Sequence, residues 1–285
     1  MIVSNPIQEP LIQLFHRLNS LYGLLFLLNN QLNAFQEMAI EIDKKNNNQS
    51  YWFSGTSIVI SDLTEYPDNR LRRYYRSGGC MFQGKQYLDM IESLIARESA
   101  WSIAQGYEAF EAFLFDTAAE YLRLNPTEAE IQQVNRFDIK CSKSILSSAN
   151  IEDWKEFIRY TYRGEGNRKI LKYLRKLAPQ LAKVEKQNNR PIDLCEWYTI
   201  VGDVRHAATH SNFTIKSQRM CSWTNEHKTN LYNFFPGDTH DNGYTLKLKE
   251  KDVEKGLTTF VEYAFIIFKC LSCIQGYEWQ IFKED

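Results

Sequence analysis

The sequence predicts an all-α protein, a helical bundle with a small β-hairpin inserted before the last helix. Apolar residues recur every three or four positions over long stretches, which is the spacing of a buried helix face. Only 13 glycines and 7 prolines occur among 285 residues, so few turns are signalled. Hydrophobic residues make up 44% of the chain and aromatic residues 14%, which supports a packed core and excludes a disordered chain.

Two long helices are predicted in the N-terminal half. The first covers residues 10–45, where apolar residues keep the three-and-four spacing throughout. The second runs from residue 85 to residue 124, carries a nearly continuous apolar stripe and ends before Asn125-Pro126. Gly106 within this stripe leaves room for a neighbouring helix to approach.

Four shorter helices are expected between residues 127 and 212. The first begins with a capping box of Thr127 and Glu130, in which each side chain accepts from the other residue's backbone N–H, and continues to about Ser147. The next three are expected at residues 151–163, at residues 167–179 and from Pro191 to about Asn212.

The hydrophobic period changes after residue 212. FTIKSQRM (213–220) alternates apolar and polar residues, as a strand does, and NLYNFF (230–235) and GYTLKLK (243–249) also look extended. The turn-rich PGDTHDNG (236–243) separates the last two. We therefore expect a hairpin at about 213–248, followed by a last helix from residue 251 to about residue 276.

The chain is predicted to divide at residue 80. Residues 1–80 form an N-terminal helix plus an irregular loop region, and residues 81–285 form the helical domain that contains the hairpin. Formal net charge is −1, but residues 155–190 hold eleven Lys/Arg against three Glu, a local charge of +8. This basic stretch is either a phosphate-binding face or an ordinary solvated surface.

Cysteine usage and the N-terminus predict a reduced, cytoplasmic protein. Six cysteines are scattered along the chain, and the first ten residues lack the basic and apolar segments of a secretory signal. Cys270 and Cys273 lie one helical turn apart with no second pair at zinc-ribbon spacing, which favours buried thiols over a metal or redox pair. No membrane span is expected, because the apolar run 21–28 is short and the run 260–274 is interrupted by charges.

The stretch VGDVRHAATHSN (201–212) places Arg205, His206 and His210 at the end of one predicted helix. His206 and His210 share a face and could hold zinc, but Ala207 stands where a zincin helix carries glutamate, and no third ligand is evident. A purely structural interpretation is that these cations stabilise the helix C-terminus. The third interpretation is RNA cleavage, in which histidine transfers protons and arginine holds phosphate oxygens. Neither a metal nor another cofactor is expected.

The same stretch resembles the R-x4-6-H signature of the HEPN superfamily, with Arg205 and His210 at the motif positions and His206 as the polar residue after the arginine. YEAFEAFLFDTAAEYL (107–122) resembles the large helix of that family, and the resemblance covers about residues 85–275. It implies a helical bundle, usually dimeric, with a metal-independent endoribonuclease site. Such proteins often act as toxins, in phage defence or in RNA processing, and some lack catalysis.

The resemblance therefore predicts a HEPN-type endoribonuclease that cleaves RNA by attack of the 2′-OH, in a toxin or phage-defence role. Arg205 would stabilise the phosphate charge, His210 would transfer protons, and His206 would assist or position RNA. The basic residues Arg168, Lys169, Lys172 and Arg175 would bind the RNA backbone. Expected partners are RNA, a second copy in a homodimer, and an antitoxin or regulatory protein.

An alternative prediction is a non-catalytic HEPN-like protein that serves as an RNA-binding or protein-interaction module. In that case the Arg205–His210 cluster is a salt-bridged helix end. Glu108 and Glu111 lie three residues apart on the second long helix. They could orient a histidine, but ordinary salt-bridge or exposed roles are favoured.

Overall fold

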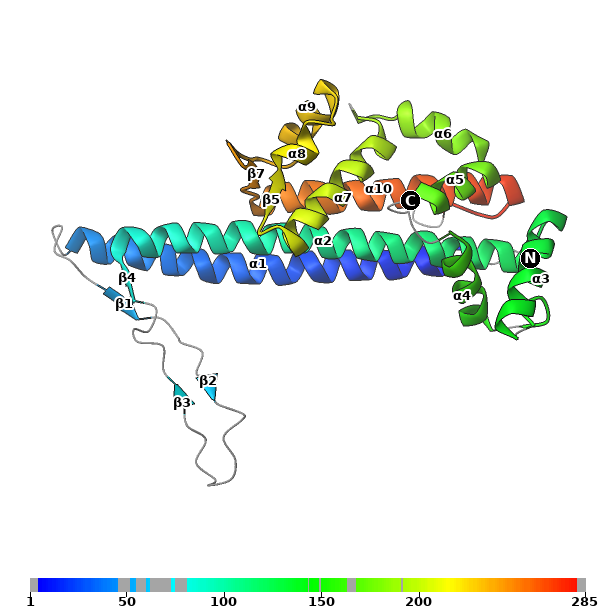
Figure 1. The fold of residues 1–285 in the computed structure, drawn as a ribbon, viewed down its shortest axis with the longest axis horizontal. Helices are drawn as coiled ribbons and strands as arrows, with labels where there is room; N and C mark the ends of the chain where they lie inside the picture. The colour runs from blue at the N-terminus through cyan, green and yellow to red at the C-terminus, as the bar shows by residue number, and fades with distance from the viewer. Residues whose placement is uncertain are drawn as a thin grey trace. The chain divides into compact units, whose positions relative to one another are not determined.

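The computed structural model describes residues 5–45, 52–54, 60–61, 73–74, 81–142, 144–148, 150–162, 168–190 and 192–280 (Figure 1). The chain forms two compact units, one of Met1–Leu25 with Arg97–Asp285 and one of Phe26–Ala96. The predicted division at residue 80 stays a prediction, and Cys80 and much of residues 51–80 lie outside the described residues.

The described part of the chain is predominantly helical, which confirms the predicted all-α class with a small β insertion. The helices are α1 (Gln8–Lys45), α2 (Gly84–Leu124), α3 (Glu128–Cys141), α4 (Ile151–Tyr162), α5 (Arg168–Leu177), α6 (Pro179–Lys186), α7 (Leu194–His210), α8 (Ser217–Met220), α9 (Asn225–Phe234) and α10 (Glu250–Gln275). The strands are β1 (Trp52–Ser54), β2 (Ile60–Ser61), β3 (Arg73–Tyr74), β4 (Met81–Gln83), β5 (Thr214–Lys216), β6 (Gly237–His240) and β7 (Gly243–Leu246).

In the unit of Phe26–Ala96, the chain segment that follows α1 and precedes α2 contains two antiparallel strand pairs. Strand β1 pairs with β4, with Trp52 opposite Gln83, and β2 pairs with β3, with Ile60 opposite Tyr74. The larger unit contains a three-stranded antiparallel sheet in the order β5-β7-β6. A hairpin forms within the predicted region, but its first strand, β6, lies in PGDTHDNG (236–243), which the sequence predicts as the turn. Strand β5 is added along the other edge of β7.

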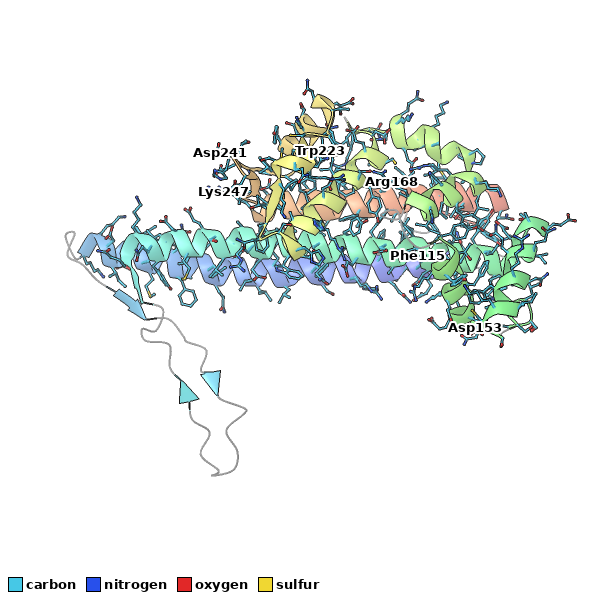
Figure 2. The ribbon with its side chains drawn as sticks, in the orientation of Figure 1. Phe115, Asp153, Arg168, Trp223, Asp241 and Lys247 are labelled. Atoms are coloured by element: carbon cyan, nitrogen blue, oxygen red, sulfur yellow. The ribbon has the colours of Figure 1, made fainter. Side chains whose placement is uncertain are left out.

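An aromatic cluster holds α2, α7 and α10 together in the larger unit. The ring of Phe110 on α2 lies 5.2 Å from Tyr198 on α7, 5.3 Å from Phe260 and 5.2 Å from Tyr263, the last two on α10. Trp197 meets Phe260 edge-on at 4.8 Å, and Phe115, labelled in Figure 2, is buried further along α2. Aromatic pairs in tilted or edge-on geometry stabilise a core beyond the area they bury.

The predicted start of α3 is confirmed and its predicted end is wrong, and one short helix, α6, is not predicted by the sequence. Thr127 and Glu130 form the predicted capping box of α3. This helix ends at Cys141 and not near Ser147, because Ser142 adopts a left-handed backbone with φ of 53°. Pro179 opens a further short helix, α6, since proline at the first helical position lacks only an N–H that would have no partner.

The segments expected as strands are also corrected. NLYNFF lies largely in α9 and is not extended, because Thr224 caps that helix and Leu231 and Phe234, three residues apart, are both buried. FTIKSQRM forms a strand only over β5 and then turns into the short helix α8. A short apolar run fits the spacing of a helix as well as that of a strand, and contacts with the rest of the fold decide which of the two forms.

Within the part of the chain that the structure describes, two helices, α1 and α10, are long and apolar enough to cross a bilayer by length and composition. Of the apolar window in α10, 56% is buried within the fold, against 22% in α1. Core helices of soluble proteins pass the same test, so the expected location and the absence of a membrane partner stay predictions.

The close approach of α10 to α2 generates a stability prediction. A Cβ atom on Gly106 would lie 2.7 Å from Leu257 Cδ2 and 3.2 Å from Phe260 Cε2. We expect Gly106→Ala to lower the free energy of unfolding by about 1–3 kcal/mol, because the added methyl overpacks the core. Thermal and denaturant unfolding would measure the change.

Gly23→Ala is the matched control for this prediction. Gly23 lies within α1, and a Cβ atom there would meet no other described part of the fold within 4 Å. Alanine should therefore leave stability unchanged or raise it by about 0.5–1 kcal/mol. Equal unfolding curves for the Gly106 and Gly23 variants would contradict the packing of α10 on α2.

Candidate functional site

Helix α7 carries the Arg205–His210 stretch, and its ends are well defined. Asp193 caps its start by accepting from the backbone N–H groups of Cys195 at 2.8 Å and Glu196 at 3.1 Å. One face of the helix is buried in the core, including Trp197 and Val204. The opposite face carries polar residues at three- and four-residue spacing, namely Thr199, Asp203, His206 and His210.

The helix ends at His210 in an unusual turn. Asn212 and Phe213 both have left-handed backbones, with φ of 46° and 64°. The N–H of Phe213 donates to the carbonyl of Ala207 at 2.9 Å, and its own carbonyl accepts from Leu246 of β7 at 2.9 Å. The Phe213 ring is buried with the Arg97 guanidinium 5.1 Å above it. These contacts tie the end of α7 to the sheet.

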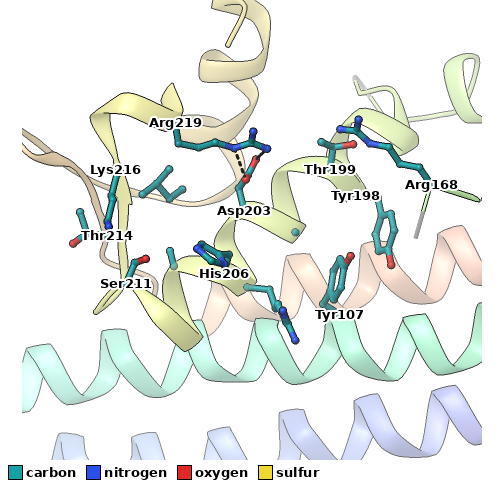
Figure 3. Close-up of a pocket in the computed structure, with 14 residues that line it drawn as sticks. Tyr107, Arg168, Tyr198, Thr199, Asp203, His206, Ser211, Thr214, Lys216 and Arg219 are labelled. Atoms are coloured by element: carbon teal, nitrogen blue, oxygen red, sulfur yellow. Dashed lines mark hydrogen bonds and ion pairs between the residues drawn. The ribbon is translucent and has the colours of Figure 1, made fainter. Parts of the chain in front are cut away.

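A cavity of about 740 Å³ lies along the polar face of α7 (Figure 3). Besides α7, its walls come from Tyr107 of α2, Arg168 of α5, strand β5 and Arg219 of α8. Segments that are far apart in the sequence therefore meet at one open space. A volume in this range suits a small organic ligand or one or two nucleotides.

The cavity is positively charged. Among its described lining residues are four cations, Arg168, Arg205, Lys216 and Arg219, and a single carboxylate, Asp203. Arg219 is held by this carboxylate, with Nε donating to Asp203 Oδ1 at 2.9 Å and Nη2 to Oδ2 at 3.3 Å. Arg168 and Lys216 form no ion pair with any described residue, so their charges are available to a bound anion.

Arg205 is paired across the cavity edge with Glu108 of α2. Its Nε and Nη2 both donate to Glu108 Oε1, at 3.2 and 2.7 Å. The hydrogen bond to Glu108 raises the pKa of Arg205 above its ordinary value, so the guanidinium stays charged. Both side chains are partly exposed, and such pairs are worth little to stability and exchange readily. Glu108 is thus a salt-bridge partner of the motif arginine.

The structure brings the two histidines together but places them differently. His206 is exposed and lines the cavity, whereas His210, also exposed, is not among the lining residues. Their ring centroids lie 5.2 Å apart. No group of three or more His, Cys, Asp and Glu that could hold a metal forms among the described residues. The roles assigned to these histidines stay predictions.

The four predicted RNA-binding residues of α5 are dispersed. Arg168, at the first position of α5, lines the cavity, while Lys169 and Lys172 are exposed elsewhere on the helix. Arg175 turns inward: its Nε donates to Glu185 Oε2 at 2.6 Å, and Glu185 also accepts from the Tyr263 hydroxyl in the core. The structure gives Arg175 an internal partner and only Arg168 a place at the cavity.

Sequence reasoning missed Lys216, Arg219 and the two tyrosines of the cavity. Tyr107 and Tyr198 stack at 4.8 Å with planes 11° apart, and the small Gly202 leaves room beside Tyr107. The polar spacing along α7 could have signalled Asp203. Lys216 and Arg219 could not be found this way, because the turn after His210 is what brings them back beside the helix.

His227 lies behind Asp203 and is half-buried. Its Nδ1 is 3.5 Å from Glu196 Oε1, and its Nε2 is 4.0 Å from Asp203 Oδ2. Burial lowers the pKa of His227 below its ordinary value, although the two carboxylates act in the opposite direction. Burial therefore favours the neutral imidazole at pH 7.

Comparison of the chain with protein-family models, with curated proteins and with solved structures found no match in any of the three. The likeness of residues 201–212 to the HEPN signature therefore stays a prediction.

The left-handed turn after His210 generates a second stability prediction. We expect Asn212→Val to lower the free energy of unfolding by about 1–2 kcal/mol, because a β-branched residue is strained at positive φ. Asn212→Gly, the matched control, should leave stability unchanged or raise it slightly, since Asn212 is exposed and glycine adopts this conformation freely. Equal free energies of unfolding for Asn212→Val and Asn212→Gly would contradict the left-handed turn.

Proposed function

We propose that this protein is a metal-independent endoribonuclease whose site is the cavity along α7. The observation that carries the proposal is the meeting of Arg205 and His206 with three further cations, Arg168, Lys216 and Arg219, around one open space. His210 adds a second imidazole 5.2 Å from the first, measured between ring centroids. A polyanion with reactive phosphodiesters is the substrate class that this combination fits.

The chemistry requires three functions that the cavity residues can supply. A base takes the proton from the ribose 2′-OH, the 2′-oxygen attacks phosphorus, and the bond from phosphorus to the 5′-oxygen breaks as an acid protonates that oxygen. The products are a 2′,3′-cyclic phosphate and a 5′-hydroxyl. His206 and His210 are assigned to the proton transfers, because imidazole exchanges protons near neutral pH. Arg205 stabilises the charge that develops on the phosphate oxygens.

The remaining cavity residues are assigned to substrate binding. Arg168 and Lys216, which have no ion-pair partner among the described residues, contact the phosphates, and Arg219 does so while Asp203 orients it. Tyr107 and Tyr198, which are buried and stacked on each other, form the inner wall of the cavity against which the substrate would lie. Arg205 exchanges Glu108 for a phosphate oxygen when RNA enters.

The wider role rests on the likeness of residues 201–212 to the HEPN signature. It supports a toxin or phage-defence role, a homodimer, and regulation by an antitoxin or another protein. These assignments belong to the proposal and depend on the ribonuclease activity.

A second candidate is a non-catalytic RNA-binding or protein-interaction module. The ion pair between Arg205 and Glu108 favours this non-catalytic module, because the guanidinium of Arg205 already has a partner in the free protein. The position of His210 outside the cavity lining also favours it. Binding of RNA without cleavage would distinguish this module from the enzyme.

Cleavage of labelled single-stranded RNA in the presence of a chelator tests the proposal. We expect the wild-type protein to yield 2′,3′-cyclic phosphate ends, and His206→Ala and His210→Ala each to lower the rate by about 10²–10⁴-fold, because each removes a proton-transfer group. Arg205→Lys should also be slower, since lysine cannot form the bidentate contact with phosphate.

His240→Ala is the matched control, because His240 is an exposed histidine on β6 that does not line the cavity. It should cleave at the wild-type rate. Wild-type cleavage that is equally fast in both His206 and His210 variants would show that the site is wrong. Wild-type protein that binds the RNA and leaves it intact would establish the non-catalytic module.

A further inference from the structure

His227, in the first turn of α9, is a histidine that the proposed chemistry does not use. Only 13% of its side chain is exposed, and its Nε2 atom is buried without a hydrogen-bond partner among the described residues. The ring lies against Trp223, with centroids 4.5 Å apart, and the backbone N–H of His227 donates to Thr224 Oγ1 at 3.1 Å. Buried polar atoms are normally hydrogen-bonded, so the unpaired ring nitrogen requires an explanation.

Two carboxylates of α7 face the two ring nitrogens. Glu196 and Asp203 are seven residues apart, so they lie on one face of the helix, two turns from each other. Nδ1 of His227 is 3.5 Å from Glu196 Oε1, and Nε2 is 4.0 Å from Asp203 Oδ2. A neutral imidazole has one N–H and turns a lone pair toward one of these carboxylates, whereas a protonated imidazole offers an N–H to both. The two carboxylates therefore form a binding site for a proton on His227.

Asp203 connects His227 to the cavity. Its Oδ2 atom, which faces His227 Nε2, also accepts a hydrogen bond from Arg219 Nη2 at 3.3 Å, while its Oδ1 atom accepts from Arg219 Nε at 2.9 Å (Figure 3). Arg219 Nη2 and His227 Nε2 thus approach the same oxygen atom. The Nη2 bond is the longer of the two from Arg219, so a competing N–H donor weakens it first.

The charged groups around His227 act in both directions. The carboxylates of Glu196 and Asp203 favour the protonated imidazole. Burial and the guanidiniums of Arg219 and Arg168 oppose it, as do the backbone N–H groups at the start of α9, because a helix N-terminus carries partial positive charge. Burial is the largest of these effects and lowers the pKa of His227 below its ordinary value. The protonated state is therefore populated only below neutral pH.

We propose that His227 is a positioning residue for Arg219: its protonation draws Asp203 Oδ2 to Nε2 and frees Arg219 Nη2 to bind a phosphate oxygen in the cavity. The bond from Arg219 Nε to Oδ1 remains and keeps the guanidinium at the cavity wall. The proton comes from solvent, and no covalent bond between heavy atoms is made or broken. The role of the freed Nη2 rests on the proposed phosphate site, but the exchange of partners at Asp203 takes place in the free protein.

Proton binding and phosphate binding must then favour each other. An anion that takes Arg219 Nη2 from Asp203 leaves Oδ2 to His227. Anion binding therefore raises the pKa of His227 by the same free energy with which protonation tightens anion binding. A histidine that only packs against Trp223 has no such coupling to the cavity.

Nuclear magnetic resonance of the full-length protein tests the exchange at Asp203. As the pH falls, the Cε1–H signal of His227 and the Nε–H signal of Arg219 should shift with one common midpoint below the ordinary histidine value. His227→Gln should abolish the Arg219 step. Glu196→Gln should move both midpoints to lower pH, because it removes a carboxylate that favours the proton. The control His240→Gln replaces an exposed histidine on β6 and should change neither signal.

Affinity for a single-stranded 2′-deoxy oligonucleotide, which has no 2′-OH to attack phosphorus, tests the coupling. One pH unit below the His227 midpoint, the wild type should bind it about fivefold more tightly than His227→Gln does, and at pH 8 the two affinities should be equal. His206 and His210 are present in both proteins, so their own protonation cancels in the comparison. The difference should vanish when both proteins also carry Arg219→Ala, because the freed Nη2 is then absent.

The inference fails if the Arg219 signal shows no step at the His227 midpoint, or keeps that step in His227→Gln. It fails equally if His227 stays neutral down to the pH of acid unfolding, or if binding depends on pH in the same way in the wild type and His227→Gln. RNA left intact by a protein that shows the coupled step would refute the ribonuclease and leave the exchange at Asp203 established. RNA cleavage without the coupled step would refute this inference alone, and the absence of oligonucleotide binding at any pH would refute both.

Discussion

The packing of Phe110 into the aromatic cluster is the constraint on which the site depends. This ring contacts Tyr198 of α7 and both Phe260 and Tyr263 of α10, so it fixes α7 against α2 and α10. Gly106, one turn earlier on α2, allows α10 to come close enough for these contacts. Since Tyr198 belongs to the cluster and also lines the cavity with its stacking partner Tyr107, the core and the cavity share a wall.

Helix α7 links this packing to the cavity. Its buried face holds the helix in the core, and the opposite face therefore presents Asp203 and His206 to the cavity. The left-handed turn at Asn212 and Phe213 then reverses the chain, and β5 and α8 return Lys216 and Arg219 to the same space. Backbone strain is retained where the surrounding structure enforces it, and here the two hydrogen bonds of Phe213 do so.

The sequence predicted those features of the fold that depend on residues close together in the chain. The capping box of Thr127, the long apolar stripes and the role of Gly106 could all be predicted, because each depends on residues a few positions apart or on the absence of a side chain. Contacts between distant segments could not. The basic stretch predicted Arg175 as a surface cation, but the turn between α5 and α6 brings Glu185 onto it. The helical structure of NLYNFF likewise depends on the burial of Leu231 and Phe234 in the folded protein.

The central claim is that the cavity along α7 binds RNA phosphates through its cations. The most direct measurement is the affinity for single-stranded RNA as a function of salt concentration, in variants with one cation removed. Arg168→Ala and Lys216→Ala should each weaken binding and reduce the slope of log affinity against log salt by about 0.7, the loss of one phosphate contact. Lys251→Ala, an exposed lysine at the start of α10, should keep the wild-type slope. Slopes that are identical in the wild type and both cavity variants would contradict the account.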